Sequence, residues 1–181
     1  MNICIYGASS DNINQTYKDA VFGLGQAMAT KGHILVFGGG TSGLMGSAVR
    51  GIQSVGGFSV GIAPRFFDKP GILHNSCNEF IFTDTMRERK RIMEERSDAF
   101  IAVPGGIGTF EELFEILTLK QLGRHRKPVA LFNINGYYDS LCEMMNHASR
   151  EGFMRPGSEN ILPVYDNISS LLDYIEKEAT R

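Results

Sequence analysis

Short runs of apolar residues alternate along the chain with longer segments in which apolar residues recur every three or four positions. The short runs predict strands over residues 3–6, 34–37, 59–63, 80–82, 99–103, 129–132 and 161–164. The longer segments predict amphipathic helices over residues 15–31, 43–55, 86–96, 109–122, 137–151 and 168–177. Strands that alternate with helices need crossover connections, which are typical of a parallel sheet. We therefore predict a Rossmann-like open parallel sheet with helices on both faces, a three-layer α/β/α fold.

The size and composition of the chain indicate one ordinary globular domain. Its 181 residues are enough for one well-buried core and few for two, so residues 1–181 are expected to form a single domain. A hydrophobic content of 43% with 21% charged residues is usual for a soluble protein. The formal net charge of −2 gives no reason to expect nucleic acid or an anionic membrane as a partner, because both need concentrated positive charge.

The cysteines and the N-terminal segment favour the reducing cytoplasm. Cys4, Cys77 and Cys142 are odd in number and lack a Cys-x-x-Cys spacing, so neither a disulfide framework nor a thiolate zinc site is expected. The first apolar run is short, breaks at Gly7 and lacks the basic head of a signal peptide, and no later segment is long enough to span a bilayer. We expect a soluble, cytoplasmic protein.

Three glycine-rich segments follow predicted strands, at residues 7–10, 38–46 and 104–109. Because the carboxyl ends of parallel strands meet at one edge of an open sheet, these segments are expected to gather where such folds bind ligands. The second segment contains a nominal Gly-x-Gly-x-x-Gly dinucleotide pattern, but no acidic residue suited to a ribose ends the next strand. None of the segments continues as the Gly-Lys-Ser/Thr of a Walker loop. Nucleotide binding without a dinucleotide or a triphosphate is the remaining hypothesis.

The third glycine segment leads from an apolar run into a helix, and this arrangement predicts an anion site. The first backbone N–H groups of a helix lack intrahelical partners and carry partial positive charge, so a phosphate binds there when no bulky side chain intervenes. Gly105, Gly106 and Gly108 remove the side chains. We expect this loop to be where the chain performs its chemistry.

Two adjacent glutamates follow the loop, and local pattern assigns them different roles. Thr109 and Glu112 fit a Thr-x-x-Glu capping box, in which Glu112 reaches back to the amide of the N-cap residue. That interpretation gives Glu112 a structural role. Glu111 has no such role and is expected to point from the start of the helix toward whatever occupies the loop.

The predicted helix at residues 86–96 is strongly basic, and one of its arginines is expected to point inward. Helical spacing places Arg89 on the same face as the apolar residues of the segment, Met86, Ile92 and Met93. A guanidinium that faces a core needs an anion, because an isolated buried charge is costly. The candidates are a ligand phosphate and the carboxylate of Glu111, and a purely structural bridge is as compatible with the spacing as a catalytic pair. Lys90 is a possible second cation near a phosphate.

These residues resemble a known family. Met-Arg-Glu-Arg-Lys at 86–90 and Pro-Gly-Gly-Ile-Gly-Thr-Phe-Glu-Glu at 104–112 are similar to the paired Met-x-x-Arg-Lys and Pro-Gly-Gly-x-Gly-Thr-x-x-Glu motifs of the LONELY GUY (LOG) family. Its members are cytokinin riboside 5′-monophosphate phosphoribohydrolases, often labelled lysine decarboxylases. The similarity covers nearly the full length and includes residues 6–10, 38–46, 121–123, 127–129 and 135–138.

The resemblance implies hydrolysis of the N-glycosidic bond of an N6-substituted adenosine 5′-monophosphate, which releases the free base and ribose 5-phosphate. It implies that Glu111 is the carboxylate that stabilises the cation-like sugar and activates water, and that Arg89 is the second catalytic residue. Substrate or phosphate binding is expected of Lys90, Gly105, Gly106, Ile107, Gly108, Thr109, Gly39, Gly40, Met45 and Ser9. No metal or other cofactor is expected. A homodimer is implied, with the apolar residues between 113 and 122 as a possible interface.

Other functions remain open at this stage. A general purine or AMP nucleosidase of nucleotide salvage and a non-enzymatic nucleotide-binding module would both use the same loop. A literal lysine decarboxylase would need pyridoxal phosphate and a lysine for a Schiff base, and Lys90 is the sole candidate near the predicted site, in surroundings suited to an anion. The base pocket is expected among Phe66, Phe67, Met45 and the loop at 64–78.

Overall fold

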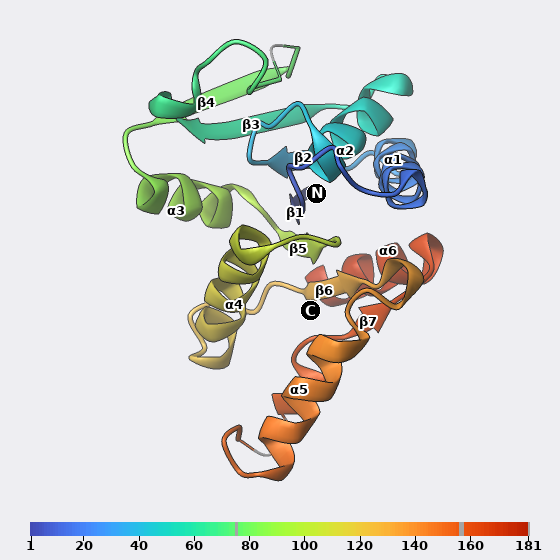
Figure 1. Ribbon diagram of the computed structural model, residues 1–181, viewed down its shortest axis with the longest axis vertical. Helices are drawn as coiled ribbons and strands as arrows, with labels where there is room; N and C mark the ends of the chain where they lie inside the picture. Colours follow the sequence, from blue (N-terminus) through green and yellow to red (C-terminus); the bar gives the residue numbers. More distant parts are fainter. Residues whose placement is uncertain (75, 156–157, 181) are drawn as a thin grey trace.

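A seven-stranded parallel sheet forms the centre of the molecule, with the strand order β4-β3-β2-β1-β5-β6-β7 (Figure 1). The computed structural model describes residues 1–74, 76–155 and 158–180. One residue of the predicted loop at 64–78 lies outside these described residues. Several residues of the predicted domain at 1–181 also lie outside them. The strands are β1 Asn2–Tyr6, β2 Ile34–Phe37, β3 Ser59–Pro64, β4 Glu79–Thr83, β5 Ala99–Ala102, β6 Val129–Phe132 and β7 Val164–Tyr165. All neighbouring strands pair in parallel, which confirms the predicted sheet.

Helices cover both faces of the sheet, as the sequence predicts (Figure 1). They are α1 Gln15–Thr30, α2 Gly43–Ser54, α3 Met86–Arg96, α4 Ile107–Gln121, α5 Asp139–Arg150 and α6 Ile168–Ala179. One apolar core joins α1, α2 and α6 to the face that carries Ile3 and Ile5. A second core joins α3, α4 and α5 to the face that carries Cys4 and Tyr6. The alternation along β1 follows from the two-residue repeat of a strand.

Most predicted boundaries agree with the structure to within two residues, and three of the differences have a clear local setting. Helix α4 begins at Ile107, two residues earlier than predicted, because Gly106 is extended and serves as the N-cap. Helix α5 begins at Asp139, since a short 3-10 turn at Ile134–Gly136 precedes it. Strand β7 is limited to Val164–Tyr165 and follows another 3-10 turn at Ser158–Asn160.

The strand order reverses direction beside β1. From β1 the chain builds outward through β2, β3 and β4, and it then returns to place β5 on the other side of β1. The loops that follow β1 and β5 therefore leave the same edge of the sheet in different directions, which opens a crevice between them. This switch point is the usual ligand site of an open α/β sheet.

In the part of the chain that the structure describes, the cysteines are free and no helix could cross a membrane. Cys4 is buried, and Cys77 and Cys142 are partly exposed. No described helix combines the length and the apolar character that a bilayer requires.

Candidate active site

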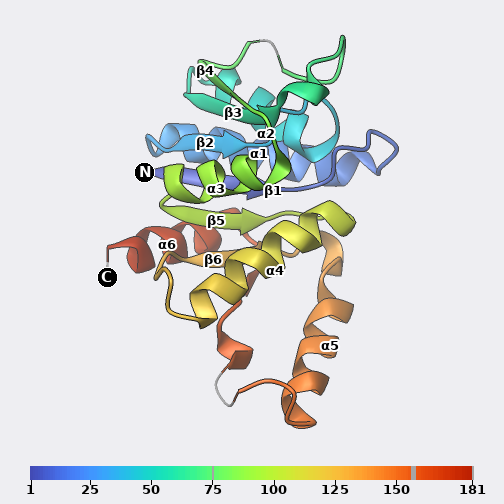
Figure 2. The same ribbon diagram turned by 90° about the vertical axis from the view of Figure 1, so that its left-hand side faces the viewer.

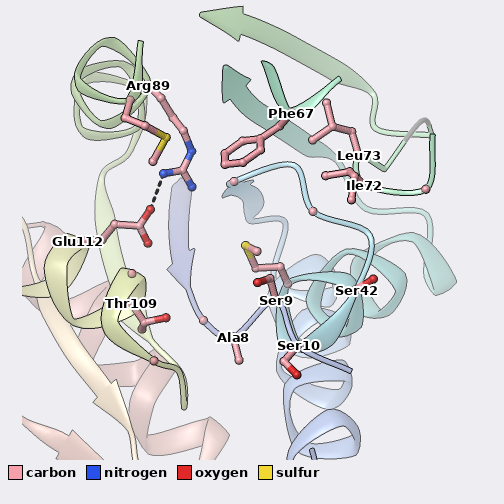
Figure 3. A pocket seen from close by; sticks show the side chains of 18 residues that line it. Ala8, Ser9, Ser10, Ser42, Phe67, Ile72, Leu73, Arg89, Thr109 and Glu112 are labelled. Atoms are coloured by element: carbon pink, nitrogen blue, oxygen red, sulfur yellow. Dashed lines mark hydrogen bonds and ion pairs between the residues drawn. The ribbon is translucent and has the colours of Figure 1, made fainter. Parts of the chain in front are cut away.

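A cavity of about 550 Å³ opens at the switch point, and all three predicted glycine loops contribute to its wall (Figure 3). The residues that line it are Gly7, Ala8, Ser9, Ser10, Gly38, Gly40, Ser42, Met45, Phe67, Gly71, Ile72, Leu73, Met86, Arg89, Gly106, Gly108, Thr109 and Glu112. Their convergence confirms the expected gathering of the loops at one edge of the sheet. The volume suits a ligand of nucleotide size.

The N-terminus of α4 is open toward this cavity. Gly106 is its N-cap, and among the described residues no side chain caps it, so its first N–H groups are available for an anion. The loop before it is docked by a hydrogen bond from Ala8 N to the Pro104 carbonyl, 3.0 Å long. Gly105 lies behind the loop, where a Cβ atom would come within 2.1 Å of Thr109 Oγ1. Side chains at this position are therefore excluded.

The predicted capping box is wrong. Thr109 is the third residue of α4 and is buried, and it is not the N-cap. The cause is the earlier start of the helix at the extended Gly106. Glu112 therefore lies well inside the helix and has no capping role.

The N-terminus of α2 also faces the cavity region, but its donors are already used. Gly43 N donates to Asp11 Oδ1 at 2.9 Å, and Leu44 N donates to the Ala8 carbonyl at 2.8 Å. The two helix starts therefore differ despite their similar glycine content. Only the start of α4, among these two, keeps first N–H groups without a side-chain cap that an anion could use.

Arg89 points inward from α3, as predicted, and its partner is a carboxylate. Thr85 caps α3 by accepting a hydrogen bond from Glu88 N at 3.1 Å, which sets where the helix begins. The Arg89 side chain is 8% exposed and its Nη1 lies 2.5 Å from Glu112 Oε1. Its Nε donates to the carbonyl of Ile62 at 3.2 Å. The buried guanidinium thus has both an ion pair and a backbone acceptor (Figure 3).

The partner of Arg89 is Glu112, so the predicted pairing with Glu111 is wrong. The side chain of Glu111 is 51% exposed and pairs instead with Lys90. Lys90 also pairs with Glu115 at 2.7 Å, so it lies away from the glycine loop where a phosphate contact was predicted. Successive helix residues are separated by about 100° around the axis, which is why one neighbour faces the cavity and the other solvent.

Burial and the neighbouring arginine act in opposite directions on Glu112. Burial raises the pKa of its carboxyl, Arg89 lowers it, and the net direction is upward. The carboxylate lies between the main cavity and a smaller one of about 270 Å³ that Lys90 lines. A buried carboxylate with a raised pKa beside a fixed cation is a common arrangement for proton transfer and charge stabilisation.

Comparison with known proteins identifies one family. Residues 45–175 match the family model described as "Possible lysine decarboxylase". The cytokinin riboside 5'-monophosphate phosphoribohydrolase LOG2 of Arabidopsis thaliana is 40% identical over 175 residues, covering 97% of this chain and 82% of the relative. A probable enzyme of the same activity from Oryza sativa subsp. japonica, LOGL3, is 38% identical over 174 residues, covering 96% and 82%. The chain belongs to the LOG family.

Solved structures similar to this LOG-family chain support its fold alone, because their sequence identity is low. The molybdenum cofactor binding protein of Rippkaea orientalis superimposes with a TM-score of 0.75 at 23% identity, covering 97% of this chain and 95% of that protein. The molybdenum cofactor carrier protein of Chlamydomonas reinhardtii gives a TM-score of 0.76 at 21% identity, covering 99% and 98%.

Of the binding residues predicted for this LOG-family chain, those that line the cavity are Ser9, Gly40, Met45, Gly106, Gly108 and Thr109. Besides Lys90, three others lie elsewhere. Gly105 is behind the loop, and Ile107 is 85% exposed on its outer side. Gly39 has a positive φ of 73° and lies against Phe80, where a Cβ atom would come within 2.6 Å of the ring. These three shape the loops without lining the cavity.

Two signals in the sequence point to Glu112. The family motif Pro-Gly-Gly-x-Gly-Thr-x-x-Glu, counted from Pro104, ends on residue 112. Helical spacing also places Glu112 beside the buried Thr109 and Ile116, three residues before it and four after. The prediction from sequence selects Glu111 instead, because the capping-box interpretation gives Glu112 a structural role.

The loop between β3 and β4, which the sequence predicts as part of a base pocket, supplies residues to the wall of the cavity. Leu73 forms an isolated antiparallel bridge with Gly40, and Thr41 N donates to the Ile72 carbonyl at 3.0 Å. These bonds bring Ile72 and Leu73 over the cavity, opposite Arg89 (Figure 3). Phe67, which was among the candidates for a base pocket, lines the same side.

Proposed function

We propose that this protein hydrolyses the N-glycosidic bond of N6-substituted adenosine 5′-monophosphates, to yield the free base and ribose 5-phosphate. One observation carries the proposal: the buried Arg89–Glu112 pair lies in the wall of the cavity that the open N-terminus of α4 also faces. A carboxylate and an anion site in the wall of one cavity match a substrate with a glycosidic bond and a phosphate. The activity named for the LOG relatives is the same.

The 5′-phosphate would bind at the start of α4. The N–H groups there carry partial positive charge, and Gly106 and Gly108 leave them accessible, since a Cβ at either glycine would meet no atom within 4 Å. Ser9 and Thr109 line the cavity close by and offer hydroxyl groups. Of the predicted phosphate ligands we retain these, and not Lys90, which two glutamates hold elsewhere.

Glu112 takes the catalytic role first expected of Glu111. Cleavage of a glycosidic bond passes through a cation-like sugar, which an ionised carboxylate stabilises. The Glu112 carboxylate also accepts a proton from the attacking water, whose oxygen bonds to the anomeric carbon. The base departs with the electron pair of the broken C–N bond and takes up a proton. Arg89 holds the carboxylate in place and favours its ionised form.

The base would lie on the apolar side of the cavity. Phe67, Ile72 and Leu73 form that side, and Met45 borders it. Phe67 is 40% exposed and Ile72 is 47% exposed, so apolar surface remains available to a ligand. An apolar N6 substituent would cover this surface, and each buried methylene group contributes about 0.8 kcal/mol. The apolar side therefore favours a cytokinin-type nucleotide over unsubstituted AMP.

The direct test measures, by chromatography, the base that is released from AMP and from N6-isopentenyl-AMP. We expect free base and ribose 5-phosphate from both, with kcat/KM at least about tenfold higher for the isopentenyl substrate because its side chain is buried. Equal or inverse preference would favour a general AMP nucleosidase. Clear binding of both nucleotides without release of base would favour a non-enzymatic binding module and contradict the hydrolase.

Decarboxylation of lysine is not supported by this site. A Schiff-base mechanism needs an accessible lysine in the cavity. Within the described chain, no lysine lines the main cavity, and Lys90 is held by Glu111 and Glu115. We therefore do not assign lysine decarboxylase activity to this chain, although the matched family model is described as "Possible lysine decarboxylase".

A homodimer is our proposal for the assembly, and helix α5 is the element that supports it. It projects beyond the sheet (Figure 2) and has no buried residue, although its polar and apolar residues are sharply separated. Met144 is 56% exposed and, together with Phe114 of α4, lines an apolar groove of about 300 Å³. A second copy of the chain would cover this surface.

The interface suggested from sequence needs revision. Leu113 and Ile116 of α4 pack in the core of their own chain and are unavailable to a partner. Leu117 is also buried, but it lines the floor of the apolar groove. Phe114 and Leu122 remain exposed.

For the cellular compartment, we propose the cytoplasm, because the three free thiols are compatible with reducing conditions.

A further inference from the structure

Two consecutive tyrosines bind backbone carbonyls of the glycine loop and of the residue before it, on the side away from the cavity. The Tyr137 hydroxyl donates to the carbonyl of Gly105 at 2.6 Å, and the Tyr138 hydroxyl donates to the carbonyl of Val103 at 2.7 Å. Their rings meet edge to face, with centroids 5.0 Å apart and planes inclined at 85°. Neither tyrosine lines the main cavity. Both therefore act on the loop and not on a ligand.

A tight turn after β6 places these hydroxyl groups. Asn135 has a positive φ of 53° and Gly136 one of 71°, which reverses the chain within a short 3-10 turn. Asn133 braces the turn: its Oδ1 accepts from Tyr138 N at 2.7 Å, and its Nδ2 donates to Asp139 Oδ1 at 2.7 Å. The position of the tyrosines is thus set by several local hydrogen bonds.

The bond to Gly105 has a consequence for the next residue. In a trans peptide the carbonyl and the following N–H point in opposite directions. When Tyr137 holds the Gly105 carbonyl, the Gly106 N–H points away from Tyr137, and Gly106 lines the cavity. A peptide between two glycines rotates easily without such a bond, because neither residue has a Cβ atom to restrict it.

We propose that Tyr137 is a positioning residue for the phosphate loop, which keeps the Gly106 N–H directed at the 5′-phosphate of the substrate. The proposal rests on the proposed function, because it assumes a phosphate at the start of α4. Of the two tyrosines, Tyr137 is the better target for a substitution experiment. It is 40% exposed, so loss of its hydroxyl leaves the core intact, whereas Tyr138 is fully buried.

The experiment compares Tyr137→Phe with the wild-type chain. Calorimetric titration with ribose 5-phosphate measures the phosphate site whether or not the protein is a hydrolase. We expect the variant to bind ribose 5-phosphate about three- to tenfold more weakly, which corresponds to the loss of one hydrogen bond. With a nucleotide substrate, KM is expected to rise by the same factor while kcat stays within about twofold. Adenosine, which lacks the phosphate, is expected to bind both proteins equally.

Tyr174→Phe is the matched control, because Tyr174 lies on α6, where its ring pairs with Tyr165 at 5.4 Å. It is expected to leave all of these quantities unchanged. Unaltered ribose 5-phosphate affinity in Tyr137→Phe would overturn the proposal, as would equal weakening of ribose 5-phosphate and adenosine, which indicates general structural damage. Failure of the wild-type chain to release base would contradict the hydrolase function but leave the ribose 5-phosphate result standing.

Discussion

At the scale of single residues, the chemistry of this site depends on which of two adjacent glutamates faces inward. Glu112 is nearly buried, touches Arg89 and lines the cavity, while Glu111 is half exposed and pairs with Lys90. The two have the same side chain and differ only in their direction from α4. Substituting each of them by glutamine therefore tests whether the inward direction of the carboxylate is what makes it catalytic.

Glu112→Gln keeps the size of the side chain and removes its charge. Because the variant can neither accept a proton from water nor stabilise the sugar cation, we expect kcat to fall at least about a hundredfold. Glu111→Gln is the control, and its kcat is expected to stay within about twofold. Steady-state rates of base release measure both. The reverse ranking would assign catalysis to Glu111.

The pH dependence of turnover tests the raised pKa of Glu112. The reaction needs the ionised carboxylate, so kcat is expected to fall as the pH decreases through this pKa, above the usual value of 4.5. Arg89 lowers the pKa, and Arg89→Gln is therefore expected to move the acidic limb of the profile to higher pH. The measurement is kcat against pH at saturating substrate. A limb that moves to lower pH, or stays in place, would contradict the coupling.

At the scale of elements, glycines allow α1 and α2 to approach each other closely. A Cβ atom on Gly51 of α2 would come within 2.1 Å of the Phe22 carbonyl of α1, and one on Gly25 within 2.4 Å of the Ala48 carbonyl. Backbone atoms cannot move aside as the end of a flexible side chain can. The contact holds α2 against α1, and the N-terminal end of α2 borders the cavity.

Gly51→Ala is expected to destabilise the fold by about 1–3 kcal/mol, because the added methyl group forces the helices apart. This corresponds to a fall in Tm of about 2–4 °C for each kcal/mol. Gly23→Ala is the control within α1, since its Cβ would lie at an ordinary 3.5 Å from Ile168 Cδ1. Its higher helix propensity is expected to leave stability equal or slightly increased. Urea unfolding of both variants measures the difference, and equal stability would refute the close contact.

Most elements could be predicted from the sequence, because apolar periodicity reflects burial directly. The ranges of β2 and α3 agree with the prediction at both ends. The start of α4 could not be predicted in the same way, since glycine is compatible with both an extended N-cap and a helix. That small error in position led to the wrong capping box and so to the wrong glutamate.

At the scale of the whole molecule, the strand order brings the site residues together and helix α5 projects beyond the sheet. The loops after β1, β2 and β5 meet only because the order of strands reverses beside β1. Helix α5 projects outside the sheet (Figures 1 and 2), where Met144 stays exposed while Leu141 and Met145 pack partly against the second core. Exposed apolar surface of this kind is stabilised by covering it.

Met144→Glu is expected to convert the proposed dimer into a monomer, because it places a charge in the apolar groove between α4 and α5. Light scattering coupled to size-exclusion chromatography measures the mass. Val55→Glu is the control, since Val55 is 48% exposed at the end of α2, outside that groove. A monomeric wild-type chain would contradict the proposed assembly, and a dimeric Met144→Glu would place its interface elsewhere.

The sequence by itself determined the parallel sheet, the gathering of glycine loops at one edge and the inward direction of Arg89, because each follows from local periodicity or from the position of glycine. Only the tertiary structure decided which groups meet there. The rotation of α4 against the sheet presents Glu112 to Arg89, and the order of strands brings Leu73 to the cavity wall and Tyr137 to the Gly105 carbonyl. Such contacts depend on packing between distant segments, which no local pattern records.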